Sequence, residues 1–157
     1  METDEEIRGK AFVHWKSWQE AYPGIVSREY LDGLTLEKCE EIAYRWRENV
    51  LVAKHGDRVV GFAGYGASGE DESGSTGEIY AIYVLSEYYG TGVGQGLMVT
   101  ALDELSDRDR VKVTVLKENK RAIRFYEKCG FRHDGTEGTV SLGEPVTVIR
   151  MVLDRKR

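Results

Sequence analysis

The sequence contains very little cysteine and no long hydrophobic run. Its two cysteines, Cys39 and Cys129, are far apart and belong to no Cys-x-x-Cys motif, which argues against a disulfide framework. No apolar stretch approaches the roughly 18 residues of a membrane span, and no signal peptide or lipidation motif is visible. We therefore expect a cytoplasmic protein with reduced thiols and no membrane partner.

Metal-ligand patterns and basic clusters are also missing. His14, His55 and His133 have no ligand spacing, so no metal site is expected. The 22 Lys and Arg residues are outnumbered by 27 Asp and Glu residues, which gives a net charge of −5. Without a basic run, this balance argues against a nucleic-acid partner and favours a cationic small molecule or peptide.

Length and composition predict one globular domain over residues 1–157. The hydrophobic fraction of 41% and the charged fraction of 31% suit a chain that buries a core without disulfides. Periodicity and turn residues predict the elements. Helices are expected over 4–22, 27–47 (broken near 32–33), 92–106 and 119–129. Strands are expected over 50–54, 59–65, 79–85, 111–116, 131–142 and 146–153. This order predicts an α/β (α+β) fold, a mixed sheet flanked by about four helices.

Glycine is plentiful at one place, between the strand at 79–85 and the helix that follows it. Four glycines occur at every second position: Gly90, Gly92, Gly94 and Gly96. A strand, a glycine turn and a helix direct free backbone N–H groups and the helix dipole at one point, where a phosphate group binds favourably. No Gly-Lys-Ser/Thr ending and no Gly-x-Gly-x-x-Gly frame is present, so neither a P-loop nor a dinucleotide fingerprint fits. A glycine-rich turn without a ligand stays open.

A second motif lies in residues 115–131, Val-Leu-Lys-Glu-Asn-Lys-Arg-Ala-Ile-Arg-Phe-Tyr-Glu-Lys-Cys-Gly-Phe. It closely resembles the Asn-x-x-Ala-x-x-Phe-Tyr-x-x-x-Gly-Phe pattern of the GNAT acetyltransferases, and Gly92 and Gly94 match that family's x-x-x-Gly-x-Gly loop. The sequence departs from the family at Tyr89, where Gln or Arg is usual. It also departs at the N-terminus, where only residues 1–3 precede the first helix. The family's first edge strand is therefore short or missing, or the natural start lies upstream.

The resemblance implies two central parallel strands that splay apart and an acetyl-CoA co-substrate bound between them. The implied cofactor-binding residues are Val84, Leu85, Tyr89, Gly90, Thr91, Gly92, Val93, Gly94, Gln95, Asn119 and Phe125. Two of them also have structural explanations, because Asn119 can simply cap its helix and Phe125 can belong to the core.

The resemblance also implies catalytic roles. Tyr126 would protonate the leaving thiolate, and a phenol with a pKa near 10 is a reasonable acid for that step. Glu78 is the candidate general base, although it can equally be a solvated strand end with ordered water as the base. Strict alternation would place Glu78, Tyr80, Ile82 and Val84 on one face, which makes Tyr80 a candidate for the acceptor site.

Trp18 and Tyr22 recur at helical spacing and form either core or an aromatic wall for the acceptor. The acidic residues 70–72 could attract an amine, or form a solvated loop. We expect direct acetyl transfer from acetyl-CoA to a primary amine, such as a polyamine or another small amino compound. A protein lysine or N-terminus is the second choice. The alternative is a non-catalytic acyl-CoA-binding or sensing module. Relatives are often homodimers, and residues 17–24 resemble a bacterial small-molecule subgroup.

Overall fold

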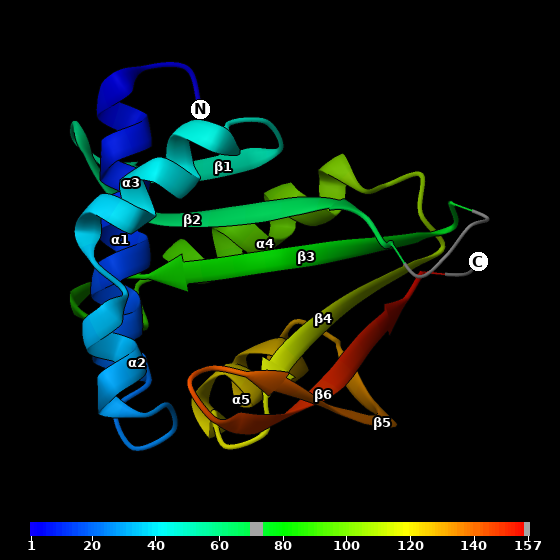
Figure 1. Cartoon of the computed structure of the whole chain (residues 1–157). Coiled ribbons are helices and arrows are strands. Elements are labelled where there is room, and N and C mark those ends of the chain that lie inside the picture. The colour runs from blue at the N-terminus through cyan, green and yellow to red at the C-terminus, as the bar shows by residue number, and fades with distance from the viewer. Residues whose placement is uncertain (70–73, 156–157) are drawn as a thin grey trace.

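A computed structural model of the chain describes residues 1–69 and 74–155 (Figure 1). The helices are α1 (Asp4–Ala21), α2 (Arg28–Gly33), α3 (Leu36–Arg45), the 3-10 turn η1 (Ser86–Tyr88), α4 (Val93–Glu104) and α5 (Lys120–Lys128). The strands are β1 (Val50–His55), β2 (Arg58–Ala67), β3 (Thr76–Val84), β4 (Arg110–Leu116), β5 (Arg132–Ser141) and β6 (Pro145–Asp154). The predicted α+β order is confirmed, η1 was not predicted, and the acidic residues 70–72 lie outside the described residues.

The six strands form one mixed sheet in the order β1-β2-β3-β4-β6-β5, in which only β3 and β4 run parallel. Among the described residues no strand precedes α1, where the sequence analysis expected the edge strand to be short or missing or the natural start to lie upstream. Helix α1 packs on one face of the sheet with α3 beside it, and α4 and α5 cover the other face (Figure 1). None of the described helices is long and apolar enough to cross a membrane.

Strands β3 and β4 separate partway along their length. They pair from Thr76 opposite Arg110 to Ile79 opposite Val113, and beyond that point no pairing joins them. Each strand keeps its other neighbour, because β3 stays paired with β2 as far as Val84 and β4 with β6 as far as Leu116. Figure 1 shows the two strands diverging towards α1 and α2. The predicted splay is therefore present.

A β-bulge in β3 makes the predicted strict alternation wrong. The partner of Gly64 is Ala81 whereas the partner of the next residue is Ile79, so Tyr80 is the extra residue on β3. Such a bulge interrupts the period of two. Ile79 and Ile82 consequently pack in the same cluster against α4, while Tyr83 packs on the α1 face. Glu78 and Val84 therefore do not share the face that alternation assigned to them.

Helix α1 lies unusually close to β2 at Gly9. A Cβ atom built on Gly9 would lie 2.6 Å from Cγ2 of Val59 and 2.7 Å from its Cβ. Val59 is β-branched and 5% exposed, so its side chain has little freedom to move away. A larger residue would push α1 off the sheet, and α1 also carries Trp18 and Tyr22. Gly9 therefore sets the depth at which these aromatic residues lie.

We predict that Gly9→Ala lowers the free energy of unfolding by about 1–3 kcal/mol, because overpacking outweighs the gain in helix propensity. The matched control is Gly96→Ala in α4, where an added Cβ meets nothing within 4 Å. That variant should raise the free energy of unfolding by about 0.5–1 kcal/mol. Urea unfolding of both variants measures the difference. Equal stabilisation by the two substitutions would contradict the close contact.

Candidate active site

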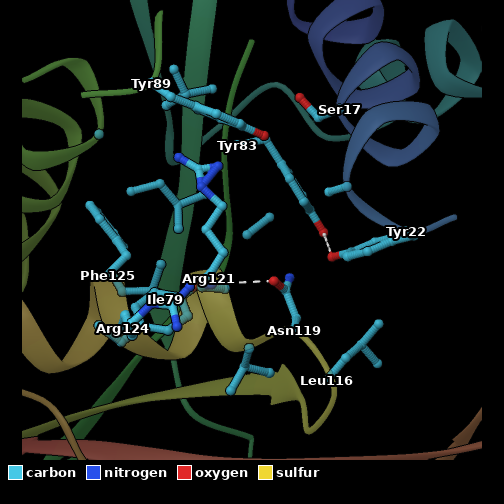
Figure 2. A pocket seen from close by; sticks show the side chains of 18 of the residues that line it. Ser17, Tyr22, Ile79, Tyr83, Tyr89, Leu116, Asn119, Arg121, Arg124 and Phe125 are labelled. Atoms are coloured by element: carbon cyan, nitrogen blue, oxygen red, sulfur yellow. Dashed lines mark hydrogen bonds between the residues drawn. The ribbon is translucent and has the colours of Figure 1, made fainter. Parts of the chain in front are cut away.

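A cavity of about 770 Å³ opens where β3 and β4 diverge. Its walls come from α1, β3, the glycine loop, the start of α4, β4, α5 and the β5–β6 hairpin. Figure 2 shows Tyr89, Arg121, Arg124 and Phe125 towards one end, and Tyr22 and Leu116 towards the other. The cavity thus connects two regions of different chemistry, which we call the basic end (Tyr89, the glycine loop, Arg121, Arg124, Lys128) and the aromatic end (Trp18, Tyr22, Tyr83, Leu116, Leu142).

The start of α4 at the basic end has backbone N–H groups that no side chain caps. Helices α1, α2, α3 and α5 each have a side-chain N-cap, whereas Gly92 caps α4 with no such hydrogen bond. Gly92 adopts φ 93°, a left-handed conformation that favours glycine. A Cβ atom at Gly90 or Gly92 would meet nothing within 4 Å, so the space in front of the loop is open. This arrangement is a favourable anion site.

Arg121 of α5 contributes a positive charge beside the glycine loop. Its guanidinium carbon lies 3.2 Å from the ring centroid of Tyr89, a cation–π contact. Arg124 and Lys128 also line this end, and no Asp or Glu belongs to the part of the wall that the structure describes. The sequence prediction missed these basic residues. The sequence did signal them through two arginines at variable positions of the second motif. The contact with Tyr89 explains how an aromatic residue suits a position where Gln or Arg is usual in the family.

The other predicted loop residues divide into those that line the cavity and those that do not. Val84, Gln95 and Gly94 line the cavity. A Cβ at Gly94 would lie 3.1 Å from the Phe125 ring, so this glycine also permits the close approach of α4 and α5. The remaining three predicted residues do not line the cavity. Leu85 is buried in the core, Val93 packs against that core, and the Thr91 hydroxyl donates a hydrogen bond to the Tyr88 carbonyl.

Helix α5 presents Asn119 and Tyr126 to the cavity. The Asn119 side chain accepts a hydrogen bond from the backbone N–H of Ala122 at 3.2 Å, so it caps the helix (Figure 2). Tyr126 is 8% exposed and packs against the rings of Phe125 and Phe131. Burial, with smaller effects of Tyr83 and Cys129, raises the pKa of Tyr126. The phenol therefore keeps its proton throughout the neutral pH range, and it is a weaker acid than a phenol with the pKa near 10 used in the sequence analysis.

The aromatic end is built around Tyr83, a residue that the sequence prediction missed because alternation placed it on the wrong face. The hydroxyl groups of Tyr22 and Tyr83 lie 3.0 Å apart in a hydrogen bond (Figure 2). Trp18 packs edge-on against Tyr22 with ring centroids 4.7 Å apart. Burial is the main cause of a raised pKa for both tyrosines. Trp18 and Tyr22, which the sequence predicted for the acceptor site, are brought together here.

Glu78 and Tyr80 lie elsewhere in relation to the cavity. Glu78 is not among the wall residues, and its carboxylate lies 3.7 Å from Nζ of the buried Lys112 on β4. Tyr80 does belong to the wall, but it is 55% exposed and its hydroxyl donates a hydrogen bond to the Ala67 carbonyl. The catalytic role of Glu78 stays a prediction. Among the described residues no cluster of His, Cys, Asp and Glu could hold a metal ion.

Comparison with known proteins identifies the family. A family model described as the acetyltransferase (GNAT) family matches residues 12–131. The uncharacterized N-acetyltransferase YuaI of Bacillus subtilis is 32% identical over an alignment of 130 residues, and the match covers 78% of this chain and 73% of that protein. The uncharacterized N-acetyltransferase Mb2688 of Mycobacterium bovis is 38% identical over an alignment of 99 residues, and the match covers 62% of this chain and 60% of that protein.

The fold is also similar to that of a solved N-acetyltransferase. The crystal structure of the PaiA N-acetyltransferase from Thermoplasma acidophilum, in complex with coenzyme A, superposes with a TM-score of 0.73 at 21% identity. The superposition covers 97% of this chain and 94% of that one. The family model covers residues 12–131 and so includes the glycine loop and the second motif. Both motifs contribute residues to the basic end of the cavity. The chain is therefore a member of the acetyltransferase (GNAT) family.

Proposed function

We propose that the protein transfers the acetyl group of acetyl-CoA directly to a primary amine while both substrates are bound. The observation that carries this proposal is the continuity of the cavity from the uncapped start of α4 to the aromatic end. A phosphate-bearing donor and a separate acceptor can therefore enter one space from two sides. The split between β3 and β4 lies between these two regions.

The basic end suits the diphosphate of coenzyme A. The first N–H groups of α4 and the guanidinium groups of Arg121 and Arg124 would hold its charges. The open space in front of Gly90 and Gly92 leaves room for phosphate oxygens close to the backbone. Because the described wall holds no carboxylate at this end, no like charge opposes an anion.

Bound acetyl-CoA would supply an activated thioester, and the chain would position the amine and the leaving sulfur. The amine nitrogen attacks the carbonyl carbon, the new C–N bond forms and the C–S bond breaks. The nitrogen loses a proton and the thiolate gains one, so the products are an N-acetyl amine and free coenzyme A. Tyr126, which keeps its proton at neutral pH, would donate a hydrogen bond to the departing sulfur.

Direct transfer is favoured over an acetyl-cysteine intermediate. Neither cysteine lines the cavity. Cys39 is fully buried in the cluster between α1 and α3, and burial raises the pKa of its thiol to about 11. Burial also raises the pKa of Cys129. A thiol with a raised pKa forms little thiolate at neutral pH, so neither residue is a good nucleophile.

A charge placed in the first turn of α4 tests the diphosphate site. Gln95→Glu should weaken acetyl-CoA binding at least tenfold, because a carboxylate would face the phosphates at close range. The same change should not lower protein stability, since the helix dipole favours a negative charge there. Gln95→Met, which adds no charge, should stay within threefold of the unmodified protein. Calorimetric titration with acetyl-CoA measures both. Equal affinity for all three proteins would place the phosphates elsewhere.

Removal of one hydroxyl tests the acid. Tyr126→Phe keeps the buried ring, so acetyl-CoA affinity and melting temperature should stay nearly unchanged while kcat falls by roughly 10²–10⁴. Release of free thiol with an amine panel gives kcat. A protein that binds acetyl-CoA and releases no thiol with any amine, with or without this substitution, would instead be a sensing module.

The companion variant Glu78→Gln tests whether Glu78 has a catalytic role besides that of Tyr126. Because Glu78 pairs with Lys112 and does not line the cavity, we expect kcat/KM to change by less than threefold. The variant should instead lower stability, since Lys112 is buried and would lose a charged partner. A loss of kcat/KM as large as that of Tyr126→Phe would establish Glu78 as the general base.

A further inference from the structure

We propose that the natural acceptor is an α-amine next to a carbonyl group on an apolar residue, as in an α-amino amide or the N-terminus of a peptide. This inference rests on the proposed acetyl transfer and narrows its acceptor. Two properties of the described cavity wall carry it: an apolar surround without a carboxylate, and two buried polar groups without hydrogen-bond partners.

The first property concerns proton removal. No Asp, Glu or His belongs to the described wall of the cavity, and burial raises the pKa of the phenols of Tyr22, Tyr83 and Tyr126. These phenols stay protonated at neutral pH and cannot take a proton from an ammonium group. We therefore infer that the site receives the amine in its neutral form. At pH 7.5 about a third of an α-amine is neutral, against roughly 0.1% of a lysine-like amine.

The lack of a carboxylate also disfavours acceptors that carry a second positive charge. A polyamine would bring an ammonium group into a region bounded by Leu116, Leu142 and Val148 without an ionised partner. Burial of an unpaired charge is costly. The only charged residues in the described wall are Arg121, Arg124 and Lys128, which would repel it. The net negative charge of the chain thus does not extend to the acceptor site.

The second property is a pair of buried polar atoms. Ser17 is 1% exposed and lines the cavity, yet its Oγ forms no hydrogen bond. The indole Nε1 of Trp18, one residue along α1, is also buried without a hydrogen-bond partner. It approaches the Tyr83 hydroxyl closely enough to moderate the pKa of that phenol, but not in hydrogen-bonding geometry. Buried polar groups without partners are unusual, so each needs an explanation.

Carbonyl oxygens of the acceptor would provide a partner for either of these atoms. An indole N–H can only donate, and a hydroxyl can also donate, so the pair matches an oxygen acceptor rather than an ammonium group. The hydroxyl groups of Tyr22 and Tyr83 already bond to each other, which leaves Ser17 and Trp18 as the recognition pair on α1. An amine with a carbonyl on the adjacent carbon places both reactive and recognised groups within one small unit.

The test compares matched amines by free-thiol release with acetyl-CoA at pH 7.5. Leucinamide is the α-amino amide, and isoamylamine has the same apolar body without the carboxamide. Spermidine and an Nα-blocked lysine amide represent the other classes, and a tripeptide amide beginning with leucine represents a peptide N-terminus. We expect kcat/KM for leucinamide or the tripeptide to exceed that for spermidine and the lysine compound at least tenfold. The ratio of kcat/KM for leucinamide to kcat/KM for the tripeptide then distinguishes a free amino amide from a peptide N-terminus as the acceptor.

Two variants separate recognition from amine reactivity. Trp18→Phe keeps an aromatic ring and removes only the N–H, and Ser17→Ala removes only the hydroxyl. Each should raise KM for leucinamide about three- to tenfold more than KM for isoamylamine, and should leave acetyl-CoA affinity unchanged. When kcat/KM is plotted against pH, the pH at which it falls on the acidic side should also follow the pKa of the amine substrate.

Three outcomes would overturn the inference. One is a preference for spermidine or the lysine compound, and another is an equal effect of the variants on both matched amines. The third is thiol release with no amine at all, which would also end the proposed transfer. The first two would leave acetyl transfer intact and exclude only this acceptor class.

Discussion

The end of the β3–β4 ladder is the constraint on which the rest of the structure depends. Past Ile79 and Val113 the two strands remain central in the sheet, but their facing edges no longer pair with each other. Backbone N–H and C=O groups strongly favour hydrogen bonding, so edges inside a sheet that face no strand must meet water or a ligand. The gap is kept open because β2 and β6 hold the outer edges of these strands. The cavity is therefore a property of the sheet, and the helices only complete its walls.

The helices complete those walls from opposite faces of the sheet, and each depends on a glycine where the approach is closest. Gly9 brings α1 against β2, which carries Ser17, Trp18 and Tyr22 to the side of Tyr83. Gly94 lets α4 approach Phe125 of α5, which brings the open helix start and Arg121 to the same end. Tight packing on both faces thus turns a separation of two strands into a cavity with defined ends.

Local patterns were enough to predict the elements, the glycine loop and the second motif, because each is encoded in a continuous stretch. The tertiary features were not readable in the same way. Nothing in the residues around Tyr80 marks the bulge, and the bulge decides that Tyr83, rather than its neighbours, faces Tyr22. The stacking of Arg121 on Tyr89 joins two segments about 30 residues apart in the sequence, so neither residue indicates it alone. The pairing of Glu78 with Lys112 likewise depends on the β3–β4 register.

Net charge was the weakest guide to the partner, and the structure explains why. A net charge of −5 suggested a cationic ligand. The described wall of the cavity nevertheless carries arginine and lysine at one end and no carboxylate at either end. Fields inside a cavity follow the nearest charges, because water and salt screen distant ones. An anionic donor and a neutral acceptor amine therefore suit this interior, whatever the sign of the outer surface.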